Sequence, residues 1–210
     1  VNMVLKIHED WKTINDYLMS MKTKFRTRAK AVYRKSAPLT IKALNAQDIL
    51  KESEHIVRLF DSVLEKSDFH IGTMNPKTFA ACKEHLGDDF IFMAYYMDEK
   101  MLGFSTAFRN AGSYDANYVG LDYSYNEQYD IYQRILYDYV EEAMKAKVPE
   151  LQFGRTSELI KSAVGAEPRD MTIYIKHKRK LSNIILKKVI QSVAPSPFEL
   201  RKPFKANFKN

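Results

Sequence analysis

The sequence has little of what marks several protein classes. It contains one cysteine, Cys82, which rules out an intrachain disulfide framework. Glycine and proline occur only seven times each, and no segment is of low complexity, so long disordered stretches are not expected. No apolar run approaches the roughly 20 residues that span a bilayer, and no signal peptide is apparent. We therefore expect a cytoplasmic protein without an integral membrane segment.

Several catalytic motifs are also missing. The five histidines lack metal-ligand spacing, and the single cysteine gives no Cys/His cluster, so no metal cofactor is expected. The sequence has no Gly-x-Ser-x-Gly elbow, no Walker loop and no dinucleotide-binding glycine pattern. Any chemistry must come from a different arrangement of residues.

Apolar residues and positive charge are both plentiful. Apolar residues form 45% of the 210, enough for a substantial core, and the net charge is +7. Part of the charge lies in residues 22–35, and part follows Lys176. Such a cluster can attract tRNA, a cofactor phosphate or an anionic membrane, but a solvated helix face explains it equally well.

The spacing of apolar residues predicts helices in the first third of the chain. Residues 8–35 carry apolar side chains at three- and four-residue intervals. A short strand at 39–44 follows, and Asn45 is a suitable N-cap for a helix at 47–66. Asn75 and Pro76 begin another helix that ends near Gly87.

The centre of the chain is rich in predicted strands. Three apolar segments joined by short turns form an antiparallel meander; they are residues 90–97, 101–108 and 114–121. The elements expected next are a helix at 128–146, a strand at 150–153, a short helix at 156–164, a strand at 171–177 and a basic helix at 180–193. This order predicts an α/β (α+β) fold with a mixed, mostly antiparallel central sheet flanked by helices.

Three segments carry a resemblance to a known family. YLMSMKTKFRTRAKAVYRKS (17–36) resembles the segment that links the two halves of Fem-type aminoacyltransferases. FIFMAYYMDEKMLGFSTAFRNAGSYDANYVGLDYSYN (90–126) resembles the sheet of their C-terminal domain, which has the GNAT fold. Residues 118–168 are similar to predicted N-acyltransferases described as peptidogalycan biosynthesis/recognition proteins. The likeness covers roughly residues 9–178 and implies a GNAT-like acyltransferase domain.

The resemblance implies a three-part organisation. We expect a basic helical linker or extension at 1–38, the GNAT-like domain at 39–178, and a basic C-terminal helix and tail at 179–210. It also implies an N-terminal GNAT half that is missing from this sequence. The activity implied is transfer of an acyl or aminoacyl group to an amine, with a small molecule or a cell-wall precursor as acceptor.

The sequence leaves two alternatives for the acyl donor, acyl-CoA and aminoacyl-tRNA. GNAT enzymes hold the pyrophosphate of acyl-CoA in a glycine-bearing loop ahead of a helix. The corresponding residues here, 122–128, contain no glycine and carry Asp122 and Glu127, which oppose an anion. Fem-type enzymes use aminoacyl-tRNA instead, which fits the basic segment 22–35 by analogy.

Two strand ends are the best candidates for the site, because ligands of open sheets bind outside the carboxyl ends of strands. At the end of strand 114–121 we predict Asp122 as a base or amine-binding carboxylate, with Tyr123 or Tyr125 as proton donor or stacking surface. The predicted substrate- or cofactor-binding residues are Asn126, Arg155, Ser157 and Lys161.

Each of these residues also has a structural interpretation. Asp122 and Asn126 can cap the helix that follows, the tyrosines can be rim packing, and Arg155 can form a surface ion pair. Two other functions also remain open. One is a non-catalytic recognition half of a tandem protein, and the other is a nucleic-acid binder that uses residues 22–35.

Overall fold

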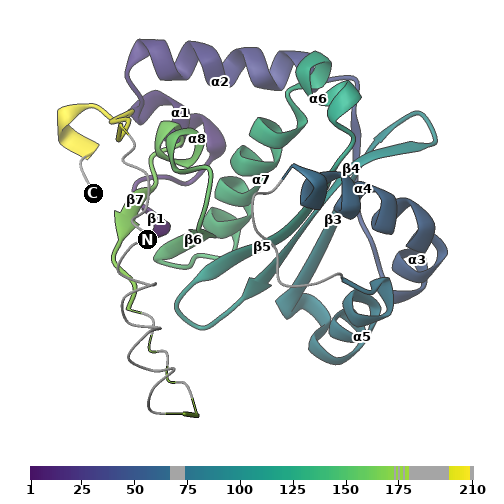
Figure 1. The fold of residues 1–210 in the computed structure, drawn as a ribbon. Helices are drawn as coiled ribbons and strands as arrows, with labels where there is room; N and C mark the ends of the chain where they lie inside the picture. The colour runs from purple at the N-terminus through teal and green to yellow at the C-terminus, as the bar shows by residue number, and fades with distance from the viewer. Residues whose placement is uncertain (67–73, 173, 175, 177, 180–198, 209–210) are drawn as a thin grey trace.

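The structure is a computed structural model that describes residues 1–66, 74–172, 174, 176, 178–179 and 199–208. Its centre is a seven-stranded sheet with the strand order β2-β3-β4-β5-β6-β1-β7 (Figure 1). The strands are β1 (Asn2–Lys6), β2 (Thr40–Ala43), β3 (Phe90–Met97), β4 (Lys100–Arg109), β5 (Tyr114–Leu121), β6 (Glu150–Gly154) and β7 (Glu167–Arg169). Only β5 and β6 pair in parallel, so the predicted mixed, mostly antiparallel sheet is confirmed.

The meander lies where the apolar pattern predicts it. β3 and β5 have the predicted bounds, and β4 is longer by one residue at each end. Asp98 takes a left-handed conformation in the tight turn between β3 and β4, which an aspartate tolerates better than most residues. In the next turn, the Asn110 backbone N–H donates to the Ser113 carbonyl.

Helices cover both faces of the sheet. They are α1 (Ile14–Ser20), α2 (Thr23–Lys35), α3 (Ala46–Lys51), α4 (Ser53–Glu65), α5 (Pro76–Leu86), α6 (Tyr123–Tyr129), α7 (Ile131–Lys145) and α8 (Glu158–Ala163). The predicted caps Asn45 and Asn75 accept hydrogen bonds from the backbone N–H groups of Asp48 and Lys77.

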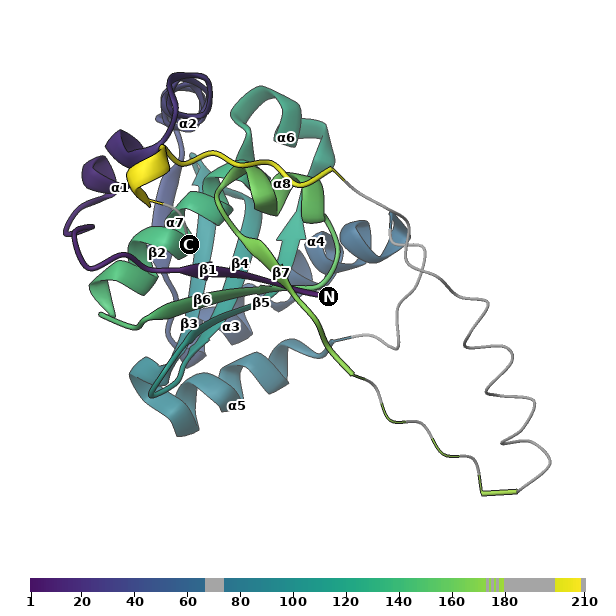
Figure 2. The same ribbon diagram turned by 90° about the vertical axis from the view of Figure 1, so that its left-hand side faces the viewer.

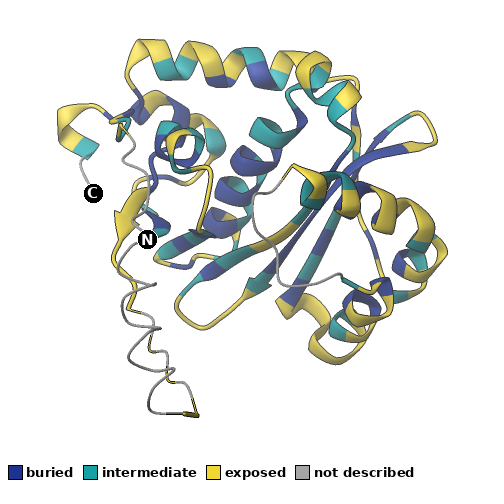
Figure 3. Cartoon of the chain, viewed as in Figure 1, coloured by how far each residue is buried: buried dark blue, intermediate teal, exposed yellow. Residues whose placement is uncertain are grey.

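Two apolar clusters form the core, one on each face. One cluster joins the sheet to α3, α4 and α5 through residues such as Ile56, Phe79 and Phe104. The other joins it to α1, α2 and α7 through residues such as Tyr17 and Ile135. Figure 2 shows the layers from the side, and Figure 3 shows buried residues along the strands and on the inner faces of the helices.

Several elements differ from the sequence prediction. β1 was not predicted; its Met3, Val4 and Leu5 are all buried between β6 and β7, so no alternation reveals it. The region 8–35 contains two helices separated at residues 21–22, and 47–66 contains α3 and α4, which meet at Glu52. Residues 123–129 form a separate helix, α6.

The last predicted strand was also wrong in position. The strand after α8 is at 167–169, and the described residues of 171–177 form none, because β1 supplies the antiparallel partner immediately after the Gly165 turn. The predicted helix at 180–193 lies outside the described residues. Further on, Phe204 packs its ring against Trp11 and Tyr17, which returns the C-terminal segment to α1.

Candidate functional site

The sheet opens between β5 and β6. These two strands pair at only two positions, Tyr114 with Leu151 and Asp115 with Gln152. Beyond this point no further pair joins them in the described residues, so the strands diverge toward their carboxyl ends. The gap interrupts an otherwise continuous sheet and lies where ligands of open sheets bind.

A bulge in β5 lies beside the opening. The register of β4 with β5 shifts between the pairs Ser105–Val119 and Ala107–Ala116, so Asn117 and Tyr118 together face Thr106. The Thr106 hydroxyl accepts a hydrogen bond of 2.9 Å from the Tyr118 backbone N–H. The bulge therefore ends regular pairing along this part of β5, and Asn117 lines the opening.

A pocket of about 310 Å³ occupies the opening, and we call it the β5–β6 pocket. Its walls come from β5, from α7, from the end of β6 with the loop after it, and from α8. The residues are Ala116, Asn117, Val119, Tyr132, Leu136, Tyr139, Phe153, Gly154, Arg155, Thr156 and Lys161.

The loop that closes the pocket has an unusual backbone. Gly154, Thr156 and Ser157 all have positive φ, with values of 75°, 66° and 54°. This conformation is free for glycine but strained for a β-branched threonine. Backbone strain of this kind concentrates at functional sites. The loop also brings Ser157 into hydrogen-bonding range of the Tyr132 hydroxyl.

Lys161 is the most unusual side chain in the pocket. It is only 6% exposed, and its Nζ donates a hydrogen bond of 2.7 Å to the backbone carbonyl of Arg155. No carboxylate of the described residues lies within ion-pair distance, although lysine is almost never buried without one. Burial lowers the pKa of Lys161 to about 8, opposed only by the charge of Glu158.

The predicted residues at the end of β5 lie outside the lining of the pocket. Asp122 caps α6 by accepting from the Ser124 N–H at 3.2 Å, and its carboxylate lies 3.3 Å from Lys100 Nζ. Burial alone would raise the pKa of Asp122, but the Ser124 hydroxyl and Lys100 hold it below its ordinary value. Asn126 accepts a 2.9 Å hydrogen bond from the Tyr132 backbone N–H, which caps α7.

The two predicted tyrosines contact lysines. The Nζ of Lys66 lies 3.8 Å from the ring centre of Tyr123, and that of Lys100 lies 4.2 Å from the ring centre of Tyr125. Burial raises the pKa of the Tyr123 hydroxyl, so it remains protonated at neutral pH. Neither residue lines the β5–β6 pocket.

The structure thus brings together part of the predicted set. Arg155 and Lys161 line the pocket, and Ser157 lies one hydrogen bond behind it. Sequence reasoning missed Tyr132 and Asn117. Tyr132 fits the apolar stripe of α7, and the bulge that positions Asn117 leaves no mark on residue spacing.

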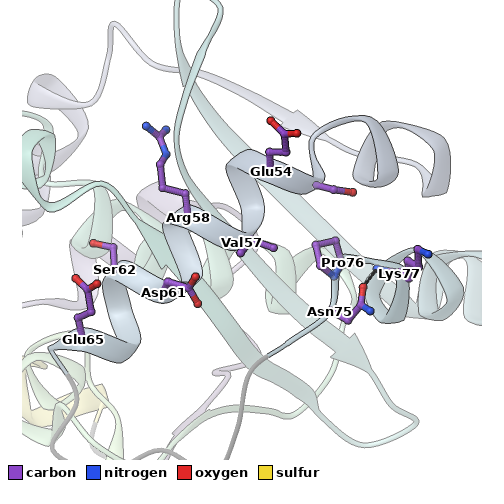
Figure 4. A pocket seen from close by; sticks show the side chains of 10 residues that line it. Glu54, Val57, Arg58, Asp61, Ser62, Glu65, Asn75, Pro76 and Lys77 are labelled. Atoms are coloured by element: carbon purple, nitrogen blue, oxygen red, sulfur yellow. Dashed lines mark hydrogen bonds between the residues drawn. The ribbon is translucent and has the colours of Figure 1, made fainter.

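A larger pocket lies elsewhere in the described part of the chain. It has a volume of about 720 Å³ and lies between α4 and the start of α5, on the face of the sheet away from α7 (Figure 4). Glu54 and Arg58 point away from Asn75 and Lys77, so the polar groups do not converge. We therefore place the candidate site at the β5–β6 pocket, where polar groups, burial and backbone strain coincide.

Two general properties complete the description. None of the helices in the described part of the chain has the length and apolar character needed to cross a membrane. Within the same residues, no group of three His, Cys, Asp or Glu side chains is arranged to hold a metal ion.

Comparisons with known proteins reveal similarity in structure but not in sequence. No protein-family model matches the sequence, and no curated protein matches it. The solved structures that superpose with TM-scores above 0.5 include FemX and a conserved protein of unknown function. FemX has a TM-score of 0.58 at 9% identity over 74% of this chain, and a conserved protein of unknown function from Bacteroides thetaiotaomicron has 0.56 at 10% identity over 78%.

The chain spans about half the length of these two structures, covering 52% of FemX and 55% of the Bacteroides protein. An aminoglycoside acetyltransferase solved with sisomicin is more distant, with a TM-score of 0.41 at 13% identity, covering 80% of this chain and 95% of that one. The predicted mixed, mostly antiparallel sheet flanked by helices is thus confirmed, and this fold is similar to that of FemX.

Proposed function

We propose that this chain is an N-acyltransferase-like domain that transfers an acyl or aminoacyl group to an amine, with a cell-envelope precursor as the class of acceptor. The observation that carries the proposal is the β5–β6 pocket, a partly polar cavity at the point where the sheet opens. The fold shared with FemX supports the reaction class by analogy.

The pocket suits the reacting end of a donor. Its volume of about 310 Å³ is at the lower end of the range for ligand sites, so it accommodates the acyl end and leaves the rest of the donor outside. Arg155 is exposed at the mouth, where its guanidinium can bind a carboxylate or phosphate in two-point fashion. Asn117 supplies a polar side chain beside the bulge.

The two helix starts after β5 favour aminoacyl-tRNA over acyl-CoA as the donor. A pyrophosphate needs free backbone N–H groups at such a helix start. In α6 the Asp122 carboxylate accepts from the Ser124 N–H, and in α7 the Asn126 amide accepts from the Tyr132 N–H. Both starts are thus capped from within the chain, and Asp122 adds a negative charge.

The basic helix α2 supports the same choice. Most of its lysines and arginines are exposed, while Ala29 and Val32 are buried beneath them. The helix is therefore a packed element with a cationic outer face, which suits contact with a phosphate backbone. We propose this face as the tRNA contact.

The catalytic roles predicted for Asp122, Tyr123 and Tyr125 remain predictions. Asp122 already caps α6 and lies beside Lys100, so action as a base requires both contacts to be released. Tyr123 and Tyr125 remain candidates as proton donors or stacking surfaces for the acceptor. Substitution of each residue tests its role.

A second candidate function is a recognition half of a tandem protein. The observation that favours it is that this sequence covers only about half of FemX and about half of the Bacteroides protein. In that case the domain binds acceptor or tRNA, and a second domain provides the chemistry.

Ligand-dependent thermal stability tests the proposal. The purified chain is heated with acetyl-coenzyme A, with coenzyme A, with deacylated tRNA and with aminoacylated tRNA, each at low and high salt. A ligand that binds only the folded state raises the melting temperature as its concentration exceeds the dissociation constant. We expect a salt-sensitive increase with aminoacylated tRNA that exceeds the increase with deacylated tRNA.

Two variants test whether the increase in melting temperature depends on the β5–β6 pocket. Arg155→Ala is expected to reduce the increase, and Arg58→Ala, which removes an exposed arginine of α4 on the opposite face, should leave it unchanged. An increase with coenzyme A that tolerates salt would replace tRNA by acyl-CoA as the donor. No increase with any of these donor ligands would favour a recognition half that binds the acceptor.

A further inference from the structure

We propose that Lys161 is the catalytic proton carrier of the β5–β6 pocket, removing a proton from the attacking amine and returning it to the leaving oxygen of the acyl donor. This inference rests on the proposed function, because it assigns the acid–base step of the same reaction. The argument starts from the other side chains that line the pocket.

The pocket offers few groups that can exchange protons. Of the described residues that line it, four are titratable, namely Tyr132, Tyr139, Arg155 and Lys161, and none is a carboxylate, a histidine or a cysteine. Amine acyl transfer requires the amine to lose a proton. One of these four groups, or water, must accept it.

Three of the four are unsuited to the task. Arginine stays protonated in proteins, which excludes Arg155. The Tyr139 hydroxyl is fully occupied in a buried hydrogen bond of 2.9 Å to the Thr106 carbonyl. Burial raises the pKa of Tyr132, so its hydroxyl keeps its proton at neutral pH. Lys161 remains.

The surroundings of Lys161 make its neutral form accessible. Its charge is removed from water, and the only acceptor it reaches in the described structure is the Arg155 carbonyl at 2.7 Å. Arg155, on the loop that supplies this carbonyl, carries a like charge on an exposed side chain, and the tyrosines of α7 are neutral. Glu158 on α8 is the one acid that favours the ammonium, and it makes no ion pair with it. The amine therefore lies next to a cavity with no carboxylate of the described residues in ion-pair range.

The strained loop explains why the amine stays in place. The left-handed residues Thr156 and Ser157 turn the chain back, so that the Arg155 carbonyl lies against the first turns of α8. That carbonyl accepts a hydrogen bond from either an NH₃⁺ or an NH₂ group. Lys161 can therefore gain or lose a proton without losing its anchor.

The proton balance closes within one turnover. The neutral Lys161 amine takes a proton from the ammonium of the acceptor, which frees a lone pair on the acceptor nitrogen. That nitrogen forms a bond to the acyl carbonyl carbon, the bond from this carbon to the donor ester oxygen breaks, and the new amide nitrogen loses its second proton to water. The Lys161 ammonium protonates the leaving oxygen, which restores the neutral amine.

Protonation of the leaving group by Lys161 assists the cleavage of an ester donor more than that of a thioester donor. The alkoxide that leaves an ester is strongly basic and needs a proton, whereas a thiolate leaves readily without one. A proton-returning lysine therefore agrees with an aminoacyl ester as donor. It is of less use for a thioester such as acyl-CoA.

Chemical labelling tests the state of Lys161 without any knowledge of the substrate. p-Nitrophenyl acetate acetylates neutral amines, forming an amide and releasing p-nitrophenolate, and peptide mass spectrometry measures each lysine. At pH 7.5 about a quarter of an amine with a pKa near 8 is neutral, against about 0.1% of an ordinary lysine. We expect Lys161 to react at least about tenfold faster than Lys145, an exposed lysine paired with Glu141 and Glu142.

The pH dependence separates a neutral lysine from a merely accessible one. The labelling rate of Lys161 should level off above about pH 8, while that of Lys145 keeps rising to pH 10 and beyond. A Lys161 rate that follows that of Lys145 at every pH would overturn the proposal. If burial keeps the reagent from reaching Lys161, a second measurement replaces the labelling. The free energies of unfolding of wild type and Lys161→Met are then compared, and their difference should change between pH 8 and 10.5. A difference that stays constant over this range would also overturn the proposal.

Two variants separate this inference from the proposed function. Lys161→Arg keeps a cation but cannot exchange its proton, so we expect tRNA-dependent stabilisation to persist while the transfer rate falls at least about a hundredfold. Full transfer activity in Lys161→Arg would overturn the role of Lys161 and leave the function intact. Failure of every donor to stabilise the wild type would overturn the proposed function and, with it, this assignment.

Discussion

The hydroxyl of Tyr95 donates a hydrogen bond of 3.0 Å to the carboxylate of Asp138, which joins the interior strand β3 to α7. The same carboxylate accepts a 2.7 Å bond from Arg134, one turn earlier on α7. Arg134 also donates to the Ser36 hydroxyl at the end of α2. This polar cluster thus connects the sheet, α7 and α2 beneath the cationic face.

Removal of Arg134 is expected to destabilise the protein strongly. The side chains of Arg134 and Asp138 are 18% and 14% exposed, so Arg134→Met leaves a largely buried carboxylate without its cation. We expect a loss of about 3 kcal/mol in the free energy of unfolding at pH 7. The matched control is Arg109→Met, whose pair with Asp89 is 44% and 59% exposed and should contribute below about 1 kcal/mol.

The effect of Arg134→Met should depend on pH. Burial raises the pKa of Asp138, and loss of Arg134 raises it further, so the variant protonates this carboxylate more readily than wild type. The folded variant then holds a proton that the unfolded chain releases, and the destabilisation shrinks as pH falls toward 4. Urea titrations at pH 7 and pH 4.5 measure it. Equal losses at both values would show that lost packing, and not the uncompensated charge, dominates.

Gly120 should not tolerate a methyl group. A Cβ at this position would clash with the Phe104 ring and lie 2.9 Å from Leu59 Cβ, because α4 packs closely on β5 there. We expect Gly120→Ala to destabilise the fold by about 1–3 kcal/mol or more, as overpacking does in well-filled cores. Gly112→Ala, in the β4–β5 turn with open space around it, should change stability by less than about 0.5 kcal/mol. Thermal unfolding of both variants compares them directly, and similar melting temperatures would refute the close approach.

Lys161→Met should stabilise the protein at neutral pH. The folded-state pKa of Lys161, about 8, lies below the model-peptide value of 10.5, so the folded chain binds fewer protons than the unfolded chain between these values. Wild-type stability therefore rises as pH increases from about 8 to 10.5, and below pH 8 the buried ammonium destabilises the fold by about 3 kcal/mol at most. The advantage of Lys161→Met is expected near pH 7 and should fade by pH 10.5.

Chemical denaturation across this pH range gives the measurement. A variant that is less stable than wild type at pH 7 would show that the Arg155 hydrogen bond outweighs the cost of burying the charge. A stabilised variant without activity would be the usual sign of a group that is retained for function at the expense of stability.

Asp122 can be tested with a matched pair of substitutions. Asparagine caps helices as well as aspartate does, so Asp122→Asn should keep α6 intact, while Asp122→Ala should cost about 1 kcal/mol. Because the pKa of Asp122 is lowered, the part of its stabilisation that depends on charge is present above pH 4 and is lost as pH falls below it. Full transfer activity in Asp122→Asn would restrict Asp122 to capping, whereas a loss of activity with unchanged stability would support its predicted role as a base.

The sequence predicts the elements whose signals are local. Asn45 and Asn75 cap the helices that they precede, and the bounds of β3 and β5 follow from apolar runs bounded by turns. Arg155 and Lys161 were identified because they follow the carboxyl end of a predicted strand. In each case the controlling contacts lie within a few residues of one another.

The remaining features depend on contacts between distant segments. β1 is a strand because β6 and β7 lie on either side of it, and its five residues carry no period of their own. The break between α6 and α7 occurs at Asp130, whose left-handed conformation is accompanied by a 3.2 Å contact with Lys35. Neither the neighbouring strands nor this lysine can be read from local spacing.

The sequence by itself determined the antiparallel meander and most of the helices around it, because turn residues, helix caps and apolar periodicity act over a few residues. Only the tertiary structure decided which polar residues share a cavity. The bulge opposite Thr106, the divergence of β5 from β6 and the strained loop at 154–157 together surround Lys161. Its burial, with no carboxylate of the described residues in ion-pair range, is a property of that assembled environment, since in the unfolded chain water surrounds the same amine.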